Sequence, residues 1–449
     1  MTAPARTAAY HAVRAVASGR ADLPSALHAS RAHLTDERDR SLAAEIVTGT
    51  LRWQRSLDHL IEHFSRRQVA KIDSEVLAIL RLSLYQLLHL TRVPASAVVD
   101  DAVDLTRAAR KTSASGFVNA VLRTTLRQRH ILPLPARPAD AADRDAALAY
   151  LGITHSHPEW LVRRWLDRYG FERTERWVRF NNETPSLTLR VNRLRATREE
   201  AIAALQQDDV DAEPTRFAPD GLVVTRGNPL RRPPDGLVFV QDEASQLVPA
   251  VVAASAGERI LDLCASPGGK TLAMAADMTD LGTIVASDVR PRRLALLQET
   301  INTAETRCVS VVRVPQTGAL PFEARFDAVL VDAPCSGLGT VRRDPDIRWR
   351  RHEADLAPFA RDQLALLMRA ADVVRPGGRL VYATCSSEPE ENDGVVASFV
   401  ASRPDFRTSD LHNHARAVIA PFIDAQGCFR TTPPAHGLEA FYAALLIRS

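Results

Sequence analysis

The sequence predicts a multidomain protein of the α and α/β classes: a helical bundle, a small α+β domain and a Rossmann-like sheet, in that order. Three observations support this. Apolar residues recur at helical spacing through residues 5–130, a mixed pattern follows in residues 155–235, and short apolar runs alternate with helical stretches from about Gly236 onward. A chain of 449 residues is long enough for about three domains.

The first part of the chain has the pattern of an all-helical domain. Val76–Leu90 is apolar on most of its sides, as a central bundle helix would be, and Val98–Ala109 forms a further helical stretch. Leu132–Ala139 is rich in proline and cannot continue a helix. We therefore expect a helical domain at residues 1–135 and a Pro- and Ala-rich linker at 136–154.

The middle of the chain combines strand and helix signals. Leu187–Val191 alternates like a strand, and Leu222–Thr225 reads as another. Between them, Thr197 and Glu200 form a capping-box pattern that predicts the start of a helix. These signals predict a small α+β domain at residues 155–236.

Residues 237–449 have the rhythm of a doubly wound parallel sheet, because most of their apolar runs are separated by helical stretches. Parallel sheets of this kind bind ligands at the carboxyl ends of their strands. The expected strands are Arg259–Leu263, Thr283–Ala286, Val309–Val314, Phe326–Val331 and Arg379–Ala383.

Composition limits the partners and the compartment. Residues 1–150 carry 21 Lys and Arg against 15 Asp and Glu, which suggests an RNA-facing module, although ordinary surface charge remains an alternative. The sequence has no run of ~20 apolar residues, no evident signal peptide and no CxxC spacing, and its five cysteines are scattered. We expect a cytoplasmic monomer without a membrane span or a metal.

A glycine loop follows the first strand of the expected sheet and opens a helix. In Asp262–Thr271, Gly268 and Gly269 allow the backbone to approach a ligand at the helix N-terminus. Asp288, twenty residues after Gly268, suits ribose hydroxyls. The loop is neither GxGxxG nor a P-loop and is typical of S-adenosylmethionine (SAM) binding; the alternative is a tight strand–helix turn.

Two cysteines carry the chemistry. Cys335 and Cys385 each follow an apolar strand, so both should lie at the carboxyl edge of the sheet with the glycine loop. A thiol beside a methyl donor suggests methylation at carbon 5 of a pyrimidine, because a thiolate that adds to carbon 6 makes carbon 5 nucleophilic. The alternative is that they are small core residues, the role expected of Cys264, Cys308 and Cys428.

Polar residues near the first thiol fit a nucleotide substrate. Asp332 could hydrogen-bond nitrogen 3 of the ring if burial raises its pKa, or it could only order the loop. In residues 342–351 five arginines surround a tryptophan, which suits phosphate binding and base stacking, with a solvated loop as the alternative. The candidate RNA-binding residues there are Arg342, Arg343, Arg348 and Trp349.

Together these residues resemble the bacterial small-subunit rRNA (cytosine-C5) methyltransferases of the Sun/Fmu (RsmB) type over nearly the whole chain. The catalytic motifs that match are Asp262–Thr271, Asp332–Gly339, Arg343–Trp349 and Tyr382–Ser386 with Glu391 and Asn392. The N-terminal stretches Gly49–Arg52, Leu82–Leu88 and Gly116–Arg123 resemble the NusB-like helical RNA-binding domain of that family.

The resemblance implies a role for each thiol and a set of cofactor contacts. By it, Cys385 is the nucleophile and Cys335 assists breakdown of the covalent adduct, with Asp332 as the third catalytic residue. The family usually has an Asp near the adenine where this chain has Gln316. The implied SAM-binding residues are Cys264, Ala265, Ser266, Pro267, Gly268, Gly269, Lys270, Asp288, Gln316 and Asp332.

We therefore expect a SAM-dependent enzyme that methylates carbon 5 of a cytosine in 16S rRNA through a cysteine–C6 adduct. A first alternative is the same chemistry on tRNA or another RNA. A second is a NusB-like RNA-binding protein with an inactive methyltransferase domain, against which the intact Cys385, Cys335 and Lys270 argue.

Overall fold

The computed structural model describes residues 2–231, 236–323, 325–414 and 416–449. By contacts the chain divides into two compact units. Unit 1 comprises residues 1–184 and 341–353, and unit 2 comprises residues 185–340 and 354–449. The chain thus leaves unit 2 after Thr340 and returns to it at Ala354.

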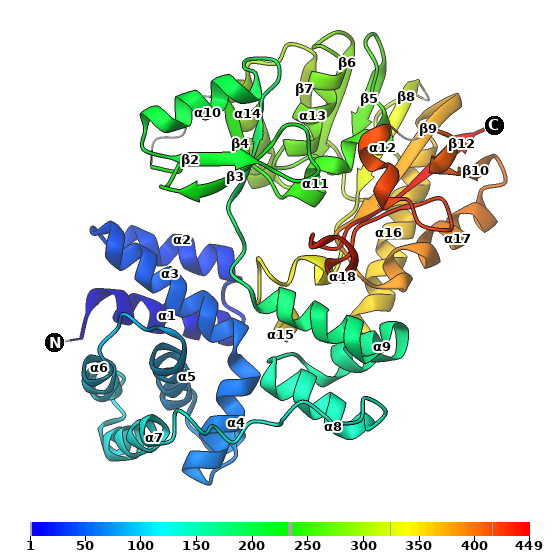
Figure 1. The fold of residues 1–449 in the computed structure, drawn as a ribbon. Helices are drawn as coiled ribbons and strands as arrows, with labels where there is room; N and C mark the ends of the chain where they lie inside the picture. Colours follow the sequence, from blue (N-terminus) through cyan, green and yellow to red (C-terminus); the bar gives the residue numbers. More distant parts are fainter. Residues whose placement is uncertain (1, 232–235, 324, 415) are drawn as a thin grey trace. The chain divides into compact units, whose positions relative to one another are not determined.

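Unit 1 is helical, as the apolar spacing predicts (Figure 1). Asp22, Asp36 and Asp73 begin three of its helices, because each side chain accepts a hydrogen bond from a backbone N–H of the first turn. The helices before residue 130 are α1 (Pro4–Ala17), α2 (Leu23–Ala32), α3 (Glu37–Arg52), α4 (Gln54–Ser65), α5 (Ser74–His89), α6 (Ala95–Ala108) and α7 (Ser115–Arg127), with 3₁₀ turns at Val69–Lys71 and Thr112–Ala114.

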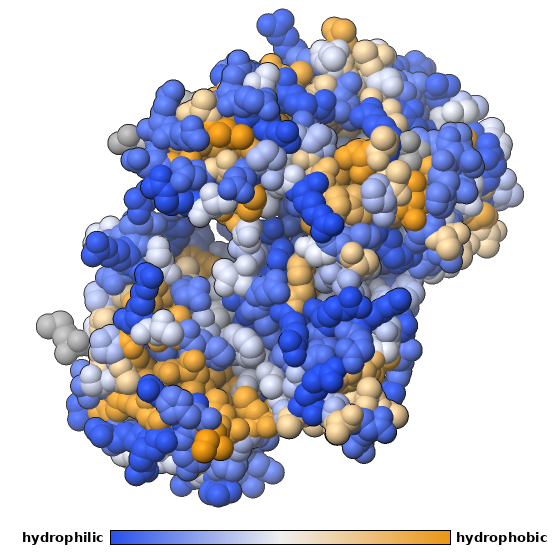
Figure 2. Space-filling model, in the orientation of Figure 1, coloured by the Kyte–Doolittle hydropathy of each residue, from blue (hydrophilic) through white to orange (hydrophobic). Residues whose placement is uncertain are grey.

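The core of unit 1 surrounds α5, whose Ile79, Leu80, Leu82 and Leu84 are completely buried. This burial on several sides explains why the α5 sequence is apolar nearly all round. On the face drawn in Figure 2, hydrophobic residues also gather at the surface of this unit. Among the partly buried residues packed against its core are Phe64, Val69, Ile72, Leu77 and Phe117.

Part of the segment expected to be a linker is helical. Helix α8 (Arg144–Ala149) begins at Asp143, whose side chain accepts from the N–H of Ala146, and a π-helical turn (Tyr150–Thr154) follows it. The proline-rich stretch ends before α8, so the helix is not obstructed. Helix α9 (Glu159–Asn182), expected in the α+β domain, belongs by its contacts to unit 1, where Trp165 stacks on Trp177.

The arginine-rich segment after the first thiol loop also belongs to unit 1, where it contains the short helix α15 (Ile347–Arg350). Arg348 is completely buried, and its guanidinium donates to the carbonyl oxygens of Ser156 at 2.9 Å and Asn181 at 3.1 Å. Trp349 donates its indole N–H to the Leu51 carbonyl at 2.6 Å. The sequence predicts that Arg348 contacts RNA. The structure instead buries its guanidinium, whose donors face protein oxygens and not solvent.

Unit 2 contains two sheets. The smaller sheet has the order β2-β3-β1-β4, all antiparallel pairs, and the predicted capping box is present at the start of α10. Its strands and helix are β1 (Thr188–Val191), α10 (Arg198–Gln207), β2 (Asp211–Pro214), β3 (Gly221–Arg226) and β4 (Val238–Val240). Helices α11 (Glu243–Leu247) and α12 (Pro249–Val252) lead to the second sheet.

The second sheet has the order β10-β12-β9-β8-β5-β6-β7, and β11 pairs with β12. All five predicted strands are present, and they pair in parallel, but β12 and β10 add antiparallel pairs, so the sheet is mixed. The strands are β5 (Arg259–Asp262), β6 (Thr283–Asp288), β7 (Val309–Arg313), β8 (Phe326–Asp332), β9 (Val374–Thr384), β10 (Phe406–Ser409), β11 (Phe429–Arg430) and β12 (Tyr442–Arg448).

Both faces of this sheet are covered, which gives the Rossmann-like layering. Successive residues of one strand enter different cores: Ile260 packs with Met274 of α13, whereas Leu261 packs in a cluster with Leu367 of α16. The remaining helices are α13 (Gly269–Asp277), α14 (Pro291–Ala304), α16 (Leu356–Ala371), α17 (Asp393–Ser402) and α18 (Pro433–His436). Among the described residues of both units, 3₁₀ turns also lie at Leu338–Thr340, Glu353–Asp355, Pro389–Glu391, Leu411–Asn413 and Ala417–Phe422.

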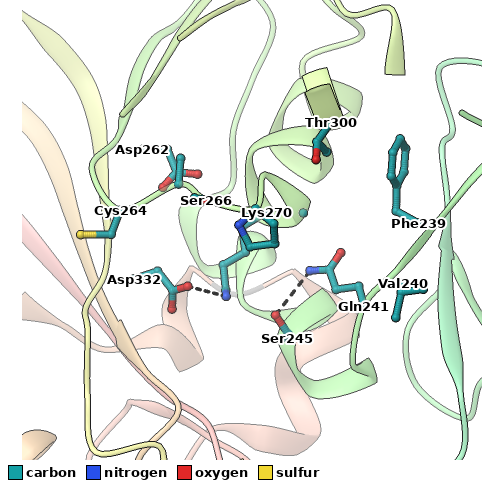
Figure 3. A pocket seen from close by; sticks show the side chains of 13 residues that line it. Phe239, Val240, Gln241, Ser245, Asp262, Cys264, Ser266, Lys270, Thr300 and Asp332 are labelled. Atoms are coloured by element: carbon teal, nitrogen blue, oxygen red, sulfur yellow. Dashed lines mark hydrogen bonds and ion pairs between the residues drawn. The ribbon is translucent and has the colours of Figure 1, made fainter. Parts of the chain in front are cut away.

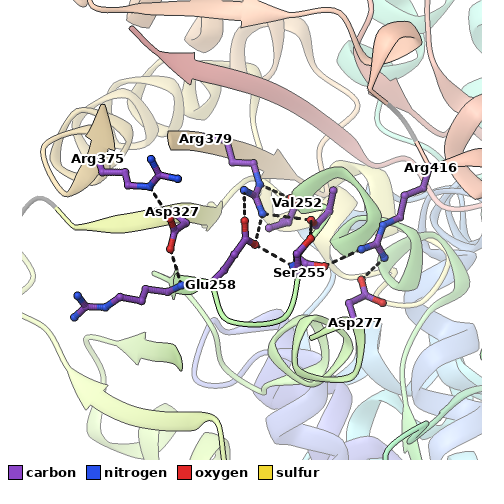
Figure 4. A network of polar contacts seen from close by, with 11 residues as sticks. Val252, Ser255, Glu258, Asp277, Asp327, Arg375, Arg379 and Arg416 are labelled. Atoms are coloured by element: carbon purple, nitrogen blue, oxygen red, sulfur yellow. Dashed lines mark hydrogen bonds and ion pairs between the residues drawn. The ribbon is translucent and has the colours of Figure 1, made fainter. Parts of the chain in front are cut away.

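Ion pairs join the strands of this sheet to the segments that precede them (Figure 4). Arg379 of β9 pairs with Glu258 at 2.6 Å and donates to the carbonyl oxygen of Val252 at the end of α12. Asp327 of β8 accepts from the N–H of Arg259 at 2.8 Å and pairs with Arg375. These contacts fix β5, β8 and β9 relative to each other.

Replacing Arg348 by alanine should destabilise unit 1. Arg348→Ala removes charge-assisted hydrogen bonds that satisfy buried carbonyl oxygens, so the free energy of unfolding should fall by about 2–3 kcal/mol. Thermal unfolding of the full chain, followed by circular dichroism, measures the effect. The exposed Arg92 provides the control Arg92→Ala, and an unchanged melting temperature in Arg348→Ala would contradict the structural role.

Candidate active site

The glycine loop lies between β5 and α13, at the carboxyl edge of the parallel strands. Gly268 has φ of +109°, a conformation that side-chain-bearing residues rarely adopt, and its N–H donates to the Ala265 carbonyl at 2.7 Å. The loop is thereby folded tightly before α13 begins at Gly269. It leaves the first N–H groups of a nine-residue helix directed toward a ligand site.

A pocket of about 250 Å³ adjoins this loop (Figure 3). It brings together most of the predicted SAM-binding residues: Cys264, Ala265, Ser266, Pro267, Gly269, Lys270 and Asp332. Gly268, Asp288 and Gln316 do not line it. The opposite wall, which sequence reasoning did not identify, is formed by Phe239, Val240, Gln241, Ser245 and Thr300, and Asp262 completes the lining.

The side chain of Gln241 is held in place by the buried guanidinium of Arg190. Its side-chain oxygen accepts from Nε of Arg190 at 2.7 Å, and its amide nitrogen lies 3.4 Å from Oγ of Ser245, the contact drawn in Figure 3. Burial lowers the pKa of Arg190 to about 10. The amide of Gln241 therefore has a fixed orientation at the pocket wall.

Lys270 and Asp332 form an ion pair within the pocket. Nζ of Lys270 lies 2.6 Å from Oδ2 of Asp332, as Figure 3 shows, and the two side chains are only 12% and 26% exposed. Burial acts to lower the pKa of Lys270, but the charge and hydrogen bond of Asp332 outweigh it, so the pKa is raised. The negative charge of a Cys385 thiolate acts in the same direction.

Asp262 is a buried acid whose hydrogen bonding is incomplete. Its Oδ2 accepts from the hydroxyl of Thr271 at 2.7 Å, whereas its buried Oδ1 has no partner in the structure. Burial raises the pKa of Asp262 to about 7, against a smaller lowering by the Thr271 hydrogen bond. An unsatisfied acceptor that lines a pocket is a group for a ligand donor.

The other two predicted cofactor residues lie at the ends of the next strands. Asp288 ends β6, and its carboxylate accepts from the N–H of Arg290 at 3.0 Å. Gln316 lies in the exposed loop after β7, and Arg369 of α16 donates to the carbonyl oxygens of Pro315, Gln316 and Gly318. Both follow the strand ends as predicted, and the role of each in cofactor binding stays a prediction.

The two thiols lie against each other. Sγ of Cys335 and Sγ of Cys385 are 3.0 Å apart, and both residues are partly exposed. The hydrogen bond to Cys385 raises the pKa of Cys335, and burial and the negative charges of Cys385 and Glu391 add to this. The raised pKa favours the thiol form of Cys335, and either sulfur can be the donor of the hydrogen bond between them.

The loops that carry the thiols are tied together by Glu391, which is completely buried. Its Oε1 accepts from the N–H of Ser336 at 2.8 Å and from the amide of Gln363 at 2.9 Å. Its Oε2 accepts from the hydroxyls of Ser336 and Ser386, each at 2.5 Å. One carboxylate thus binds the residue after each cysteine, so it fixes the spacing of the two sulfurs.

The remaining cysteines do not resemble nucleophiles. Burial raises the pKa of Cys264, and burial with a hydrogen bond to Asp280 raises the pKa of Cys308 to about 12. Burial also raises the pKa of Cys428, which accepts from the hydroxyl of Tyr442. All five cysteines are free.

Within the described ranges, no group of three His, Cys, Asp or Glu residues could hold a metal, and no helix could span a membrane.

Glu391 belongs to a predicted catalytic motif, but the sequence assigns it no role. A signal was present: the dipeptide Cys-Ser occurs twice, at Cys335-Ser336 and Cys385-Ser386, and a shared acceptor would explain the repeated serine. No comparable signal marks Gln241 or Arg190, because their contact joins residues 51 positions apart in different strands and loops.

A glycine loop opening a helix of a Rossmann-like sheet, with a strand-end acid and two strand-end thiols, defines a SAM-dependent methyltransferase. Comparisons agree with this class. The chain matches the family descriptions NusB family over residues 3–127, RsmF/B-like ferredoxin-like domain over 157–231, and 16S rRNA methyltransferase RsmB/F over 249–447.

Known relatives cover nearly all of the chain, which therefore belongs to the 16S rRNA methyltransferase RsmB/F family. It is 33% identical over 90% of both chains to the probable ribosomal RNA small subunit methyltransferase B of Bacillus subtilis. It is 35% identical to the ribosomal RNA small subunit methyltransferase B of Pseudomonas putida over 91% of this chain and 92% of that one. The crystal structure of PH0851 has a TM-score of 0.80 with 26% identity and covers 99% of each chain.

Replacing Asp262 by asparagine should change the pH dependence of stability. A folded pKa of about 7, above the ordinary value near 3.8, means that the folded state binds this proton more tightly than the unfolded state. Its contribution to stability therefore falls as pH rises from about 4 to about 7. Asp262→Asn removes this loss and should be more stable than the wild type at pH 8 by roughly 1–4 kcal/mol.

Thermal unfolding of both proteins without cofactor, between about pH 5 and pH 8, measures this difference. The exposed Asp362 gives the control Asp362→Asn, which should follow the wild type throughout. A difference between Asp262→Asn and the wild type that does not grow with pH would show that Asp262 is ionised when folded.

Proposed function

We propose that this protein transfers a methyl group from SAM to carbon 5 of a cytosine in 16S rRNA, through a covalent bond between Cys385 and carbon 6 of the base. Family membership supports the substrate class, since the relatives named above are small-subunit rRNA methyltransferases. The observation that carries the proposed chemistry is the pair of sulfurs 3.0 Å apart at the ends of β8 and β9.

The proposed reaction needs a thiolate because carbon 5 of cytosine is a weak nucleophile. Addition of the Cys385 thiolate to carbon 6 converts the ring to an enamine, whose carbon 5 can then attack a methyl group. The ammonium of Lys270 favours negative charge at Cys385, and Asp332 can hydrogen-bond ring nitrogen 3 during addition. The base must leave its stack to reach these groups.

The second thiol has a separate task in this scheme. After transfer, carbon 5 carries both the new methyl group and its original proton. We propose that Cys335, deprotonated once the Cys385 sulfur is bonded to the ring, accepts that proton. The electron pair of the broken C–H bond re-forms the C5–C6 double bond, and the C6–S bond breaks to release the Cys385 thiolate. Cys335 adjoins the bonded sulfur and is proposed to assist this step.

The residues of the pocket suit SAM, which supplies the methyl group. Its ammonium and sulfonium are cationic, and the pocket region holds the acids Asp262 and Asp332, of which Asp262 has an unsatisfied oxygen. The N-terminus of α13 suits the SAM carboxylate. We assign the cofactor to residues 264–270 with Asp332, and we propose Asp288 for the ribose and Gln316 for the adenine.

RNA binding is proposed for the parts outside the catalytic domain. We retain the division into a helical NusB-like domain (1–135), a linker (136–154), a small α+β domain (155–236) and a catalytic domain (237–449) as a proposal. Arg342, Arg343 and Trp349 remain candidates for RNA contact, whereas the burial of Arg348 argues for a structural role. We expect the protein to act in the cytoplasm, as a monomer.

The function and its nucleophile can be tested together. Bisulfite sequencing of 16S rRNA incubated with the protein and SAM should reveal one 5-methylcytosine. Cys385→Ala should abolish it while leaving SAM binding, measured by calorimetry, nearly unchanged, because Cys385 does not line the pocket. Cys428→Ala is the matched control. Methylation of tRNA alone would overturn the rRNA assignment, and near wild-type turnover in Cys385→Ala would overturn the nucleophile.

Cys335→Ala should trap the covalent intermediate. If Cys335 assists removal of the carbon 5 proton, its loss leaves the RNA bonded to Cys385. A protein–RNA species that survives denaturing gel electrophoresis, requires SAM and disappears in the double variant with Cys385→Ala is the expected result. An inactive Cys335→Ala protein without such a species would assign Cys335 to an earlier step.

A further inference from the structure

The two active-site thiols are chemically identical groups in van der Waals contact, yet only one can be the nucleophile. Two thiolates 3.0 Å apart would repel each other strongly, so ionisation of one sulfur disfavours ionisation of the other. Which sulfur carries the charge depends on the fixed charges on either side of the pair.

Glu391 is bound to the loop of Cys335 by two hydrogen bonds from Ser336, the next residue. Its carboxylate accepts four hydrogen bonds from neutral donors: two from Ser336, one from Ser386 and one from Gln363. A carboxylate has enough acceptor positions on its two oxygens for all four donors. Tyr382, whose pKa is raised by burial, donates to the backbone carbonyl oxygen of Glu391.

A positive charge, the ammonium group of Lys270, acts on Cys385. Lys270 interacts electrostatically with Cys385, and this is one of the causes that raise the pKa of Lys270. Lys270 is also paired with Asp332 at 2.6 Å, so its position is fixed. The negative charge of Glu391, by contrast, is among the causes that raise the pKa of Cys335.

We propose that Glu391 is the positioning residue that selects Cys385 as the nucleophile of the pair. Its carboxylate holds the two cysteine loops so that the sulfurs lie at hydrogen-bonding distance. The same carboxylate repels negative charge from Cys335, while Lys270 attracts that charge to Cys385. Cys335 then remains a thiol that donates a hydrogen bond to the nucleophile. This inference rests on the proposed function for its catalytic meaning, but the position of the charge can be measured without RNA or SAM.

Glu391→Gln removes the negative charge of this side chain while keeping its shape and its hydrogen-bonding positions. The carbonyl oxygen of glutamine can accept from the Ser336 N–H and from Gln363. Its amide can donate to the hydroxyls of Ser336 and Ser386, which accept as well as donate. The variant should therefore keep the loops together and lose only the negative charge. The exposed Glu299 of α14 gives the matched control Glu299→Gln.

The readout is the rate at which iodoacetamide alkylates each cysteine of the reduced full-length protein, followed by peptide mass spectrometry over a range of pH. Alkylation follows the thiolate fraction. In the wild type and in Glu299→Gln, Cys385 should react faster than Cys335. In Glu391→Gln the ratio of Cys335 to Cys385 rates should rise by about tenfold for each unit by which the pKa of Cys335 falls.

Glu391→Asp tests the same charge with a shorter reach. It should keep the wild-type alkylation preference but methylate rRNA more slowly, because one carboxylate can no longer bind both loops. An unchanged ratio in folded Glu391→Gln overturns the proposal, as does a Glu391→Asp protein that alkylates like Glu391→Gln. If neither variant folds, faster alkylation of Cys335 than of Cys385 in the wild type overturns it.

These outcomes are independent of the proposed function. Loss of the alkylation preference concerns Glu391 alone, whereas an active Cys385→Ala protein would remove the catalytic scheme and leave the measured charge distribution intact.

Discussion

The parallel pairing of β8 with β9 is the constraint on which the active site depends. The register places Asp332 opposite Ala383, so Cys335 lies three residues and Cys385 two residues beyond one paired position. Backbone bonds continue past the strands, since the Ala333 N–H donates to the Ala383 carbonyl and the Gly339 N–H to the Cys385 carbonyl. The sulfurs therefore meet because the sheet brings their loops together, and a shift of one residue would separate them.

Lys270 supplies the positive charge with which the acids of the active site interact. Lys270 lies on α13 directly after the glycine loop, so the cofactor loop and the thiol chemistry are connected by a single side chain. Asp332 pairs with it, and burial raises the pKa of Asp262 to about 7, so the charge of Asp262 is only partly developed at neutral pH. A cationic cofactor would favour ionisation of Asp262, because opposite charge stabilises the charged form of an acid. Burial of these groups is tolerated because ligand binding supplies their missing partners.

The sequence predicted the strands and strand-end residues well, because apolar runs and turn chemistry are local. It did not predict the antiparallel strands β10 and β12, since pairing with β9 joins residues about 60 positions apart, such as Tyr442 and Thr384. The repeated Cys-Ser dipeptide is consistent with a shared acceptor, but the sequence could not identify that acceptor as Glu391, whose four donors come from residues 336, 363 and 386. A buried carboxylate has no local signature, because its stability depends on donors supplied by the tertiary fold.

The arginine-rich segment shows that composition alone does not distinguish RNA binding from a structural role. Composition suggested phosphate binding, yet Arg348 donates to Asn181 at the end of α9, where helical carbonyl oxygens lack intrahelical partners. An arginine beside a helix C-terminus stabilises it through the dipole as well as through hydrogen bonds. The same residue type would suit a phosphate equally, so only burial distinguishes the two roles.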